Sequence, residues 1–89
     1  MNSQALPQFW ALYRRLPRTV RQRAAKAYRI WRAHPESPGL QFKQVGNRRL
    51  VYSARIADAY RTLGLVEGDT IYWFWIGPHD EYDRIINSL

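Results

Sequence analysis

Five side chains between residues 43 and 82 could together act on a phosphate group. They are Lys43, Arg55, Arg61, His79 and Tyr82. Guanidinium and ammonium groups stabilise charge that develops on phosphate, and histidine is the side chain whose ordinary pKa suits proton transfer near neutrality. Cleavage of RNA without a metal needs both charge stabilisation and proton transfer. These residue types therefore suggest metal-independent RNA cleavage as a hypothesis.

Strands predicted from period-two alternation would bring the cations together. Residues 50–56 alternate in polarity, Ala57-Asp58 makes a tight connection, and a second strand follows over residues 60–66. We therefore expect Arg55 and Arg61 to be near one another on adjacent strands. Lys43 would come from a neighbouring strand over residues 40–45, which the Gly46-Asn47 turn ends.

The aromatic run at residues 71–76, IYWFWI, predicts a central strand covered on both faces. Gly77-Pro78 ends this strand, because proline cannot donate to the ladder. His79 and Tyr82 follow directly. Asp80 is expected to cap a last helix whose apolar stripe carries Tyr82, Ile85, Ile86 and Leu89.

Each candidate also has an ordinary structural explanation, which the sequence leaves open. Arg55 and Arg61 could be sheet arginines paired with nearby carboxylates, namely Asp58, Glu67 or Asp69. His79 and Tyr82 could be a residue at a helix start and a packed anchor of the last helix.

The charge distribution favours a polyanionic or acidic partner. Twelve of the 14 basic residues are arginine, and the net charge is +7. Residues 1–62 carry +11 and residues 63–89 carry −4. Because the guanidinium fork matches phosphate bidentately, nucleic acid is the favoured partner, and binding to an acidic protein is the alternative.

The N-terminal third predicts two helices, separated by the Leu16-Pro17 pair. The first spans residues 5–16, and the second continues to the HPESPG segment at 34–39. Small alanines are expected to pack the pair closely, with eight basic residues between Arg14 and Arg32. A strand in residues 1–8 is expected to be missing or reduced, because MNSQALPQ has no strand pattern. The fold class is therefore α+β: a two-helix hairpin packed on a mainly antiparallel four-stranded sheet, with a short C-terminal helix.

Composition excludes several classes of protein. The 89 residues allow one domain, 1–89, and the absence of cysteine rules out disulfides and thiolate metal sites. Neither a phosphate-binding glycine loop nor a metal-ligand spacing is present, so no metal or cofactor is expected. Neither a signal peptide nor a run of membrane-spanning length is visible, and we expect a cytoplasmic protein without membrane contact.

Nearly the whole chain, from about Phe9 to Ile86, resembles the RelE/ParE superfamily of type II toxin–antitoxin toxins, especially its mRNA interferases. The segments that carry the resemblance are LPRTVRQRAAKAYRIWRAHP, LQFKQV, YSARIADAYRTLG and FWIGPHDEYDRII. The last two segments are the most specific. YSARIADAYRTLG contains the arginine pair Arg55 and Arg61, and FWIGPHDEYDRII contains His79 and Tyr82 after the strand.

The resemblance implies a toxin that cleaves mRNA on the ribosome, inhibits translation and is held inactive by a cognate antitoxin in a hetero-oligomer. Arg55 and Arg61 would hold the scissile phosphate, and His79 or Tyr82 would act as acid or base. Lys43 resembles a basic residue of the family's first post-helical strand, and Arg48 and Arg49 are further candidates for RNA phosphate binding.

Two other functions stay open at this stage. The ParE branch inhibits DNA gyrase without cutting RNA, which requires surface complementarity and no acid–base pair. A degenerate, non-toxic relative would only bind RNA or a protein partner.

Overall fold

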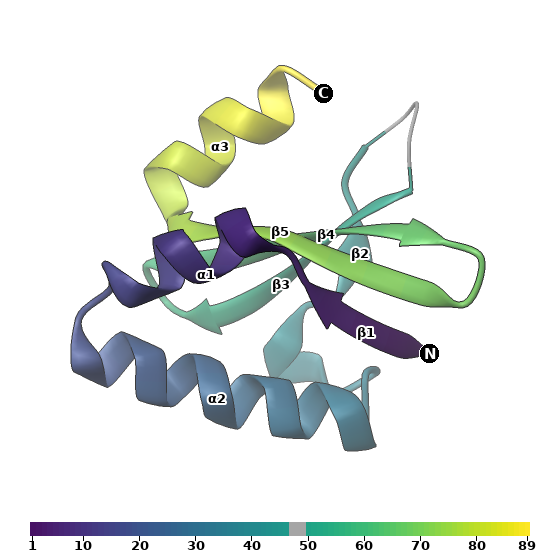
Figure 1. Ribbon diagram of the computed structural model, residues 1–89, viewed down its shortest axis with the longest axis horizontal. Helices are drawn as coiled ribbons and strands as arrows, with labels where there is room; N and C mark the ends of the chain where they lie inside the picture. The colour runs from purple at the N-terminus through teal and green to yellow at the C-terminus, as the bar shows by residue number, and fades with distance from the viewer. Residues whose placement is uncertain (47–49) are drawn as a thin grey trace.

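The computed structural model describes residues 1–46 and 50–89 of the 89-residue chain (Figure 1). Strands and helices follow one another as an α+β fold. In chain order they are β1 (Asn2–Ala5), α1 (Pro7–Arg14), α2 (Arg18–Ala33), the 3-10 turn η1 (Pro38–Leu40), β2 (Lys43–Gln44), β3 (Val51–Ala57), β4 (Tyr60–Glu67), β5 (Thr70–Pro78) and α3 (His79–Asn87).

The sheet has five strands in the order β1-β5-β4-β3-β2, and not the four expected. It is also mixed, because β1 pairs in parallel with β5 while the other neighbours are antiparallel. The strand that residues 1–8 were expected to lack or to shorten is present as the four-residue β1. The sequence NSQA lacks apolar alternation because β1 is an edge strand held by backbone pairing, with Asn2 opposite Thr70 and Ala5 opposite Trp73.

The strand expected over residues 40–45 is reduced to Lys43–Gln44. Leu40 instead ends the 3-10 turn, and Gln41 follows it with a left-handed backbone, φ 47° and ψ 41°. This conformation interrupts an extended chain, so pairing with β3 begins only at Lys43. The expected Gly46-Asn47 turn reaches into residues 47–49, which lie outside the described residues.

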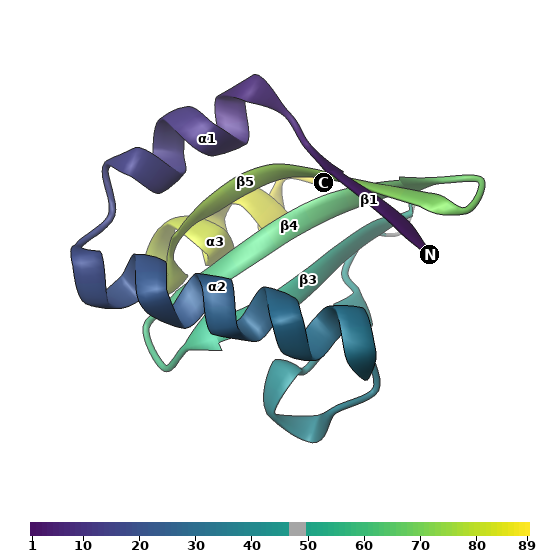
Figure 2. The same ribbon diagram turned by 60° about the horizontal axis from the view of Figure 1, so that its bottom comes forward.

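Helices cover both faces of the sheet (Figure 2). Helices α1 and α2 lie on one face, and α3 lies on the other. The alanines of α2 were expected to pack the two helices closely, but they face the sheet instead. Ala24 packs with Ile76, and Ala27 packs with Ala54 and Trp73. No helix in the described part of the chain is long and apolar enough to cross a membrane.

Strand β5 buries aromatic side chains on both faces because it contains a bulge. Trp73 lies opposite Gly64, but Trp75 lies opposite Leu63, so Phe74 is an extra residue in the ladder. Trp73 consequently packs with α2, whereas Trp75 packs with Tyr82 of α3. The predicted cover on both faces is confirmed, although β4, and not β5, is the middle strand.

Gly64 is required opposite this bulge. A Cβ atom at this position would lie 2.6 Å from Cγ1 of Ile71 and 2.9 Å from Cε3 of Trp73. Both side chains are buried in the same cluster and have little room to move.

Helix α3 begins directly after Pro78, whose extended backbone forms the N-cap. Asp80, which was expected to cap the helix, therefore lies inside its first turn. Its carboxylate accepts a hydrogen bond from the Glu81 amide there. Tyr82 is the buried residue of the helix, and Leu89 lies exposed beyond its end.

We expect Trp73→Ala to reduce the free energy of unfolding by about 3–5 kcal/mol, because the indole is only 6% exposed and lies between α2 and the sheet. Trp75→Ala, at 9% exposure, should cost a similar amount on the other face. Denaturant unfolding measures both. A loss below about 1 kcal/mol for both variants would contradict the position of β5 in the core.

Candidate functional site

A small polar cavity opens on the α3 face of the sheet, between β2, β3, β4 and the start of α3. Its volume is about 100 Å³, which leaves room for a small group such as a phosphate. Its lining consists of Gln41, Lys43, Ser53, Arg55, Arg61, His79 and Tyr82.

All five residues that opened the sequence analysis line this cavity. Arg55 and Arg61 are direct partners in the β3–β4 register, as expected for adjacent strands. Lys43 arrives from β2, where it lies opposite Ser53. The proposed phosphate-binding residues Arg48 and Arg49 lie outside the described residues.

The two arginines are held in different ways. Arg55 forms an ion pair with Asp58, one of the carboxylates that its structural explanation named. Arg61 instead donates from Nη1 to the carbonyl oxygens of Ala57 and Tyr60, at 2.8 and 2.9 Å. Among the described residues no carboxylate pairs with Arg61. The turn therefore fixes its guanidinium by neutral dipoles and leaves its charge available to an anion.

His79 is placed at the mouth of the cavity by both its backbone and its ring. The amide of His79 donates to the carbonyl of Ala59 at 2.8 Å, which ties the start of α3 to the β3–β4 turn. Its Nδ1 lies 3.0 Å from Oδ2 of Asp83, one helical turn later, and the side chain is 43% exposed. A carboxylate at Nδ1 orients the imidazole and leaves the other ring nitrogen for a second partner.

Tyr82 lies deeper and is only 5% exposed. Its hydroxyl donates to Oγ of Ser53 at 3.0 Å, and its ring centroid is 5.5 Å from that of His79. Tyr82 thus has the anchoring contact that its structural explanation required, and it also lines the cavity.

Sequence reasoning missed Ser53 and Gln41 as cavity residues. For Ser53 the signal was present in the alternation, because Ser53 shares a face with Arg55 two residues later. Gln41 precedes β2 and has a left-handed backbone, so alternation does not account for its place in the cavity. Neither side chain is charged, so neither attracted a chemical role.

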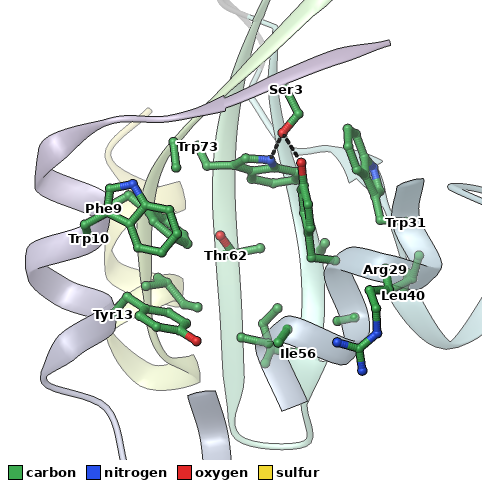
Figure 3. Close-up of a pocket in the computed structure, with 17 residues that line it drawn as sticks. Ser3, Phe9, Trp10, Tyr13, Arg29, Trp31, Leu40, Ile56, Thr62 and Trp73 are labelled. Atoms are coloured by element: carbon green, nitrogen blue, oxygen red, sulfur yellow. Dashed lines mark hydrogen bonds between the residues drawn. The ribbon is translucent and has the colours of Figure 1, made fainter. Parts of the chain in front are cut away.

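A larger groove opens on the opposite face of the sheet, between α1 and α2 (Figure 3). Its volume is about 500 Å³, and Trp10, Tyr13 and Trp31 are among the aromatic residues of its walls. Ser3 lies at one end of the groove, where its Oγ accepts hydrogen bonds from Trp73 Nε1 at 3.1 Å and from the Tyr28 hydroxyl at 3.2 Å.

Comparison with known proteins gives one family and a consistent fold. The profile of the family described as ParE-like toxin domain matches residues 18–84. A search of curated proteins found no match.

Solved toxin structures share the fold at low sequence identity. The RelB–RelE antitoxin–toxin complex from Methanococcus jannaschii matches with a TM-score of 0.71 and 20% identity, covering 90% of this chain and 95% of that chain. The YoeB/ParE toxin from Agrobacterium tumefaciens matches at 0.68 and 15%, covering 89% and 99%. The isolated E. coli RelE toxin matches at 0.64 and 16%, covering 99% and 98%.

We expect Asp58→Asn to change the free energy of unfolding by no more than about 1 kcal/mol, because the Asp58 carboxylate is 95% exposed and solvent screens its pair with Arg55. Thermal or denaturant unfolding at low salt measures the change. A loss of several kcal/mol would mean that the ion pair holds the turn together, and would favour a purely structural role for Arg55.

Proposed function

The chain belongs to the RelE/ParE superfamily of toxin–antitoxin toxins through its ParE-like toxin domain, and from this premise we propose that it is a metal-independent endoribonuclease that cleaves mRNA on the ribosome. In this proposal the protein acts in the cytoplasm, where cleavage of the message stops translation.

One observation carries the proposal: a phosphate-sized cavity joins three cationic side chains to a carboxylate-oriented histidine. In the proposed reaction the 2′-hydroxyl of the RNA attacks the adjacent phosphorus, and the bond to the 5′-oxygen breaks. Arg61, Arg55 and Lys43 would stabilise the negative charge that grows on the phosphorane oxygens. The 2′-hydroxyl loses a proton and the leaving 5′-oxygen gains one.

We assign proton transfer to His79 in preference to Tyr82. His79 is nearly half exposed and can reach a bound substrate, whereas the Tyr82 hydroxyl is buried and already donates to Ser53. An imidazole also changes charge near neutral pH far more readily than a phenol does. Tyr82 therefore lines the cavity without transferring a proton.

Gyrase inhibition is the second candidate, and the match to a ParE-like profile is the observation that favours it. Such an inhibitor would use the same basic surface for binding without chemistry. Loss of the His79 imidazole at the cavity mouth would then weaken gyrase binding only through the contact area of one side chain.

For the nuclease we expect His79→Ala to lower single-turnover cleavage of ribosome-bound mRNA by about a hundredfold or more, because it removes a proton-transfer group. Arg61→Ala should lower cleavage by a similar factor through lost phosphorane stabilisation. Both variants should stay folded, and the His79 variant should still bind ribosomes.

The matched control is His34→Ala, because His34 lies at the end of α2 with an exposed side chain that pairs with Glu36. This control should keep full cleavage and full growth arrest. If the parent protein arrests growth without cleaved mRNA, and His79→Ala arrests growth equally, the nuclease assignment is wrong and gyrase activity becomes the next assay.

We further propose that the groove between α1 and α2 receives an acidic, amphipathic segment of the antitoxin. One compared structure is an antitoxin–toxin complex, which motivates a protein partner here. The groove offers an apolar floor, while Trp10 and Tyr28 remain 44% and 41% exposed on its sides. Exposed aromatic patches of this kind mark protein interaction surfaces.

The charge around the groove selects the partner. Helix α2 carries six basic residues and no acidic residue, and Arg29 lines the groove itself. A second copy of this chain would bring another +7 and would be repelled, whereas an acidic helix would be attracted. The resulting complex would be a toxin–antitoxin hetero-oligomer.

We expect Arg29→Glu to weaken antitoxin binding, measured by co-purification from the native operon and by titration of the purified pair. Arg23→Glu is the matched control, because it makes the same charge change on the same helix outside the groove lining. Equal losses in the two variants would mean that net charge alone, and not the groove, determines binding. Recovery of the parent protein without any acidic companion would contradict the partner proposal.

A further inference from the structure

We propose that Ser53 donates a hydrogen bond directly to an anionic oxygen bound in the cavity, and that Tyr82 acts only through Ser53. The identity of that oxygen as an RNA phosphate rests on the proposed function. The hydrogen-bonding role of Ser53 rests on the cavity itself.

The hydrogen bonds of Ser53 indicate an unused donor. A serine hydroxyl has one donor and two acceptor positions. The Tyr82 hydroxyl occupies one acceptor position at 3.0 Å. Among the described residues, no protein acceptor takes the proton of the Ser53 hydroxyl. Because Ser53 is only 1% exposed, bulk water does not freely satisfy this donor either.

The position of Ser53 directs this donor toward a ligand. Ser53 lies between Lys43 on β2 and Leu63 on β4, and it precedes Arg55 by two residues on the same face of β3. It therefore lines the floor of a cavity whose charged groups attract an anion. A phosphate oxygen is the acceptor that these cations would bring within reach of the serine hydroxyl.

The hydrogen bond from Tyr82 strengthens this donor. When one hydroxyl accepts a hydrogen bond, the donor that it carries becomes more polar, so a chain of two hydroxyl groups binds an anion better than one group alone. The chain would run from the Tyr82 phenol to Ser53 and from Ser53 to the anion. Tyr82 is thus a positioning residue, and Ser53 is the group that touches the ligand.

Titration with inorganic phosphate, followed through the backbone amide shifts of β3, tests the proposal without requiring any cleavage. Loss of one hydrogen bond to a charged group should weaken phosphate binding by Ser53→Ala about ten- to a hundredfold. Tyr82→Phe should weaken it less, because the serine donor remains. The double variant Ser53→Ala/Tyr82→Phe should bind as weakly as Ser53→Ala alone.

Thr62→Val is the matched structural control. Thr62 is also a buried hydroxyl residue, but it lies on the opposite face of the sheet and donates to the Trp75 carbonyl at 2.8 Å. This variant should lose stability and keep the phosphate affinity of the parent. The double variant guards against misfolding of Ser53→Ala, because removing both partners leaves no buried hydroxyl unpaired.

Three results would overturn the proposal: parental affinity in Ser53→Ala, no phosphate binding by the parent, or a full further loss when Tyr82→Phe is added to Ser53→Ala. The last would mean that the phenol touches the anion itself. The outcome is separable from the proposed function. Serine-dependent phosphate binding without mRNA cleavage would refute the nuclease alone, whereas mRNA cleavage with serine-independent binding would refute this inference alone.

Discussion

Strand β5 has to bury aromatic side chains against helices on both faces of the sheet, and the rest of the structure depends on how it does so. A regular strand would place Trp73 and Trp75 on the same face. The bulge at Phe74 separates them, so Trp73 packs with α2 while Trp75 packs with Tyr82. Without this change of face Tyr82, the buried residue of α3, would lose the largest apolar side chain of its cluster, which Val51 and Leu63 complete. The start of α3, and the histidine that begins it, would then have fewer packing contacts beside the hydrogen bond from the His79 amide to the Ala59 carbonyl.

The same sheet carries an electrostatic cost beside the polar cavity. Arg55 and Arg61 face one another across β3 and β4, and like charges in direct opposition destabilise a strand pair. Asp58 offsets part of the repulsion by pairing with Arg55, while the turn carbonyls hold Arg61 without neutralising it. A structural arginine pair would gain from two carboxylates, one for each guanidinium. The asymmetry found here leaves one positive charge ready for an anion, which is the condition that a phosphate site requires.

The sequence predicted the position of a side chain wherever a chemically distinctive residue lay in a periodic segment. It did not predict elements that backbone pairing alone determines. Period-two alternation placed Arg55 beside Arg61, and the proline after the aromatic run placed His79 at the cavity mouth. Strand β1 gave no such signal, because an edge strand of polar residues is held by main-chain bonds that composition does not record. The left-handed backbone of Gln41, which shortens β2, was equally hidden, since nothing in a glutamine predicts positive φ. The alternation placed Ser53 beside Arg55, but the role proposed for Ser53 depends on a tyrosine 29 residues away.

The two cavities lie on opposite faces of one sheet, which constrains how a partner could control the site. Strand β4 serves both, since Thr62 lines the groove and the adjacent Arg61 lines the polar cavity. Because the two cavities open on opposite faces of the sheet, a segment that occupied the groove would not itself contact the arginines of the polar cavity. In the proposed complex, a single helix in the groove would therefore anchor the antitoxin without covering the polar cavity. Direct inhibition would require a second antitoxin segment that passes around an edge of the sheet. The edge at β2 would bring that segment to the polar cavity, because Lys43 of this edge strand lines it.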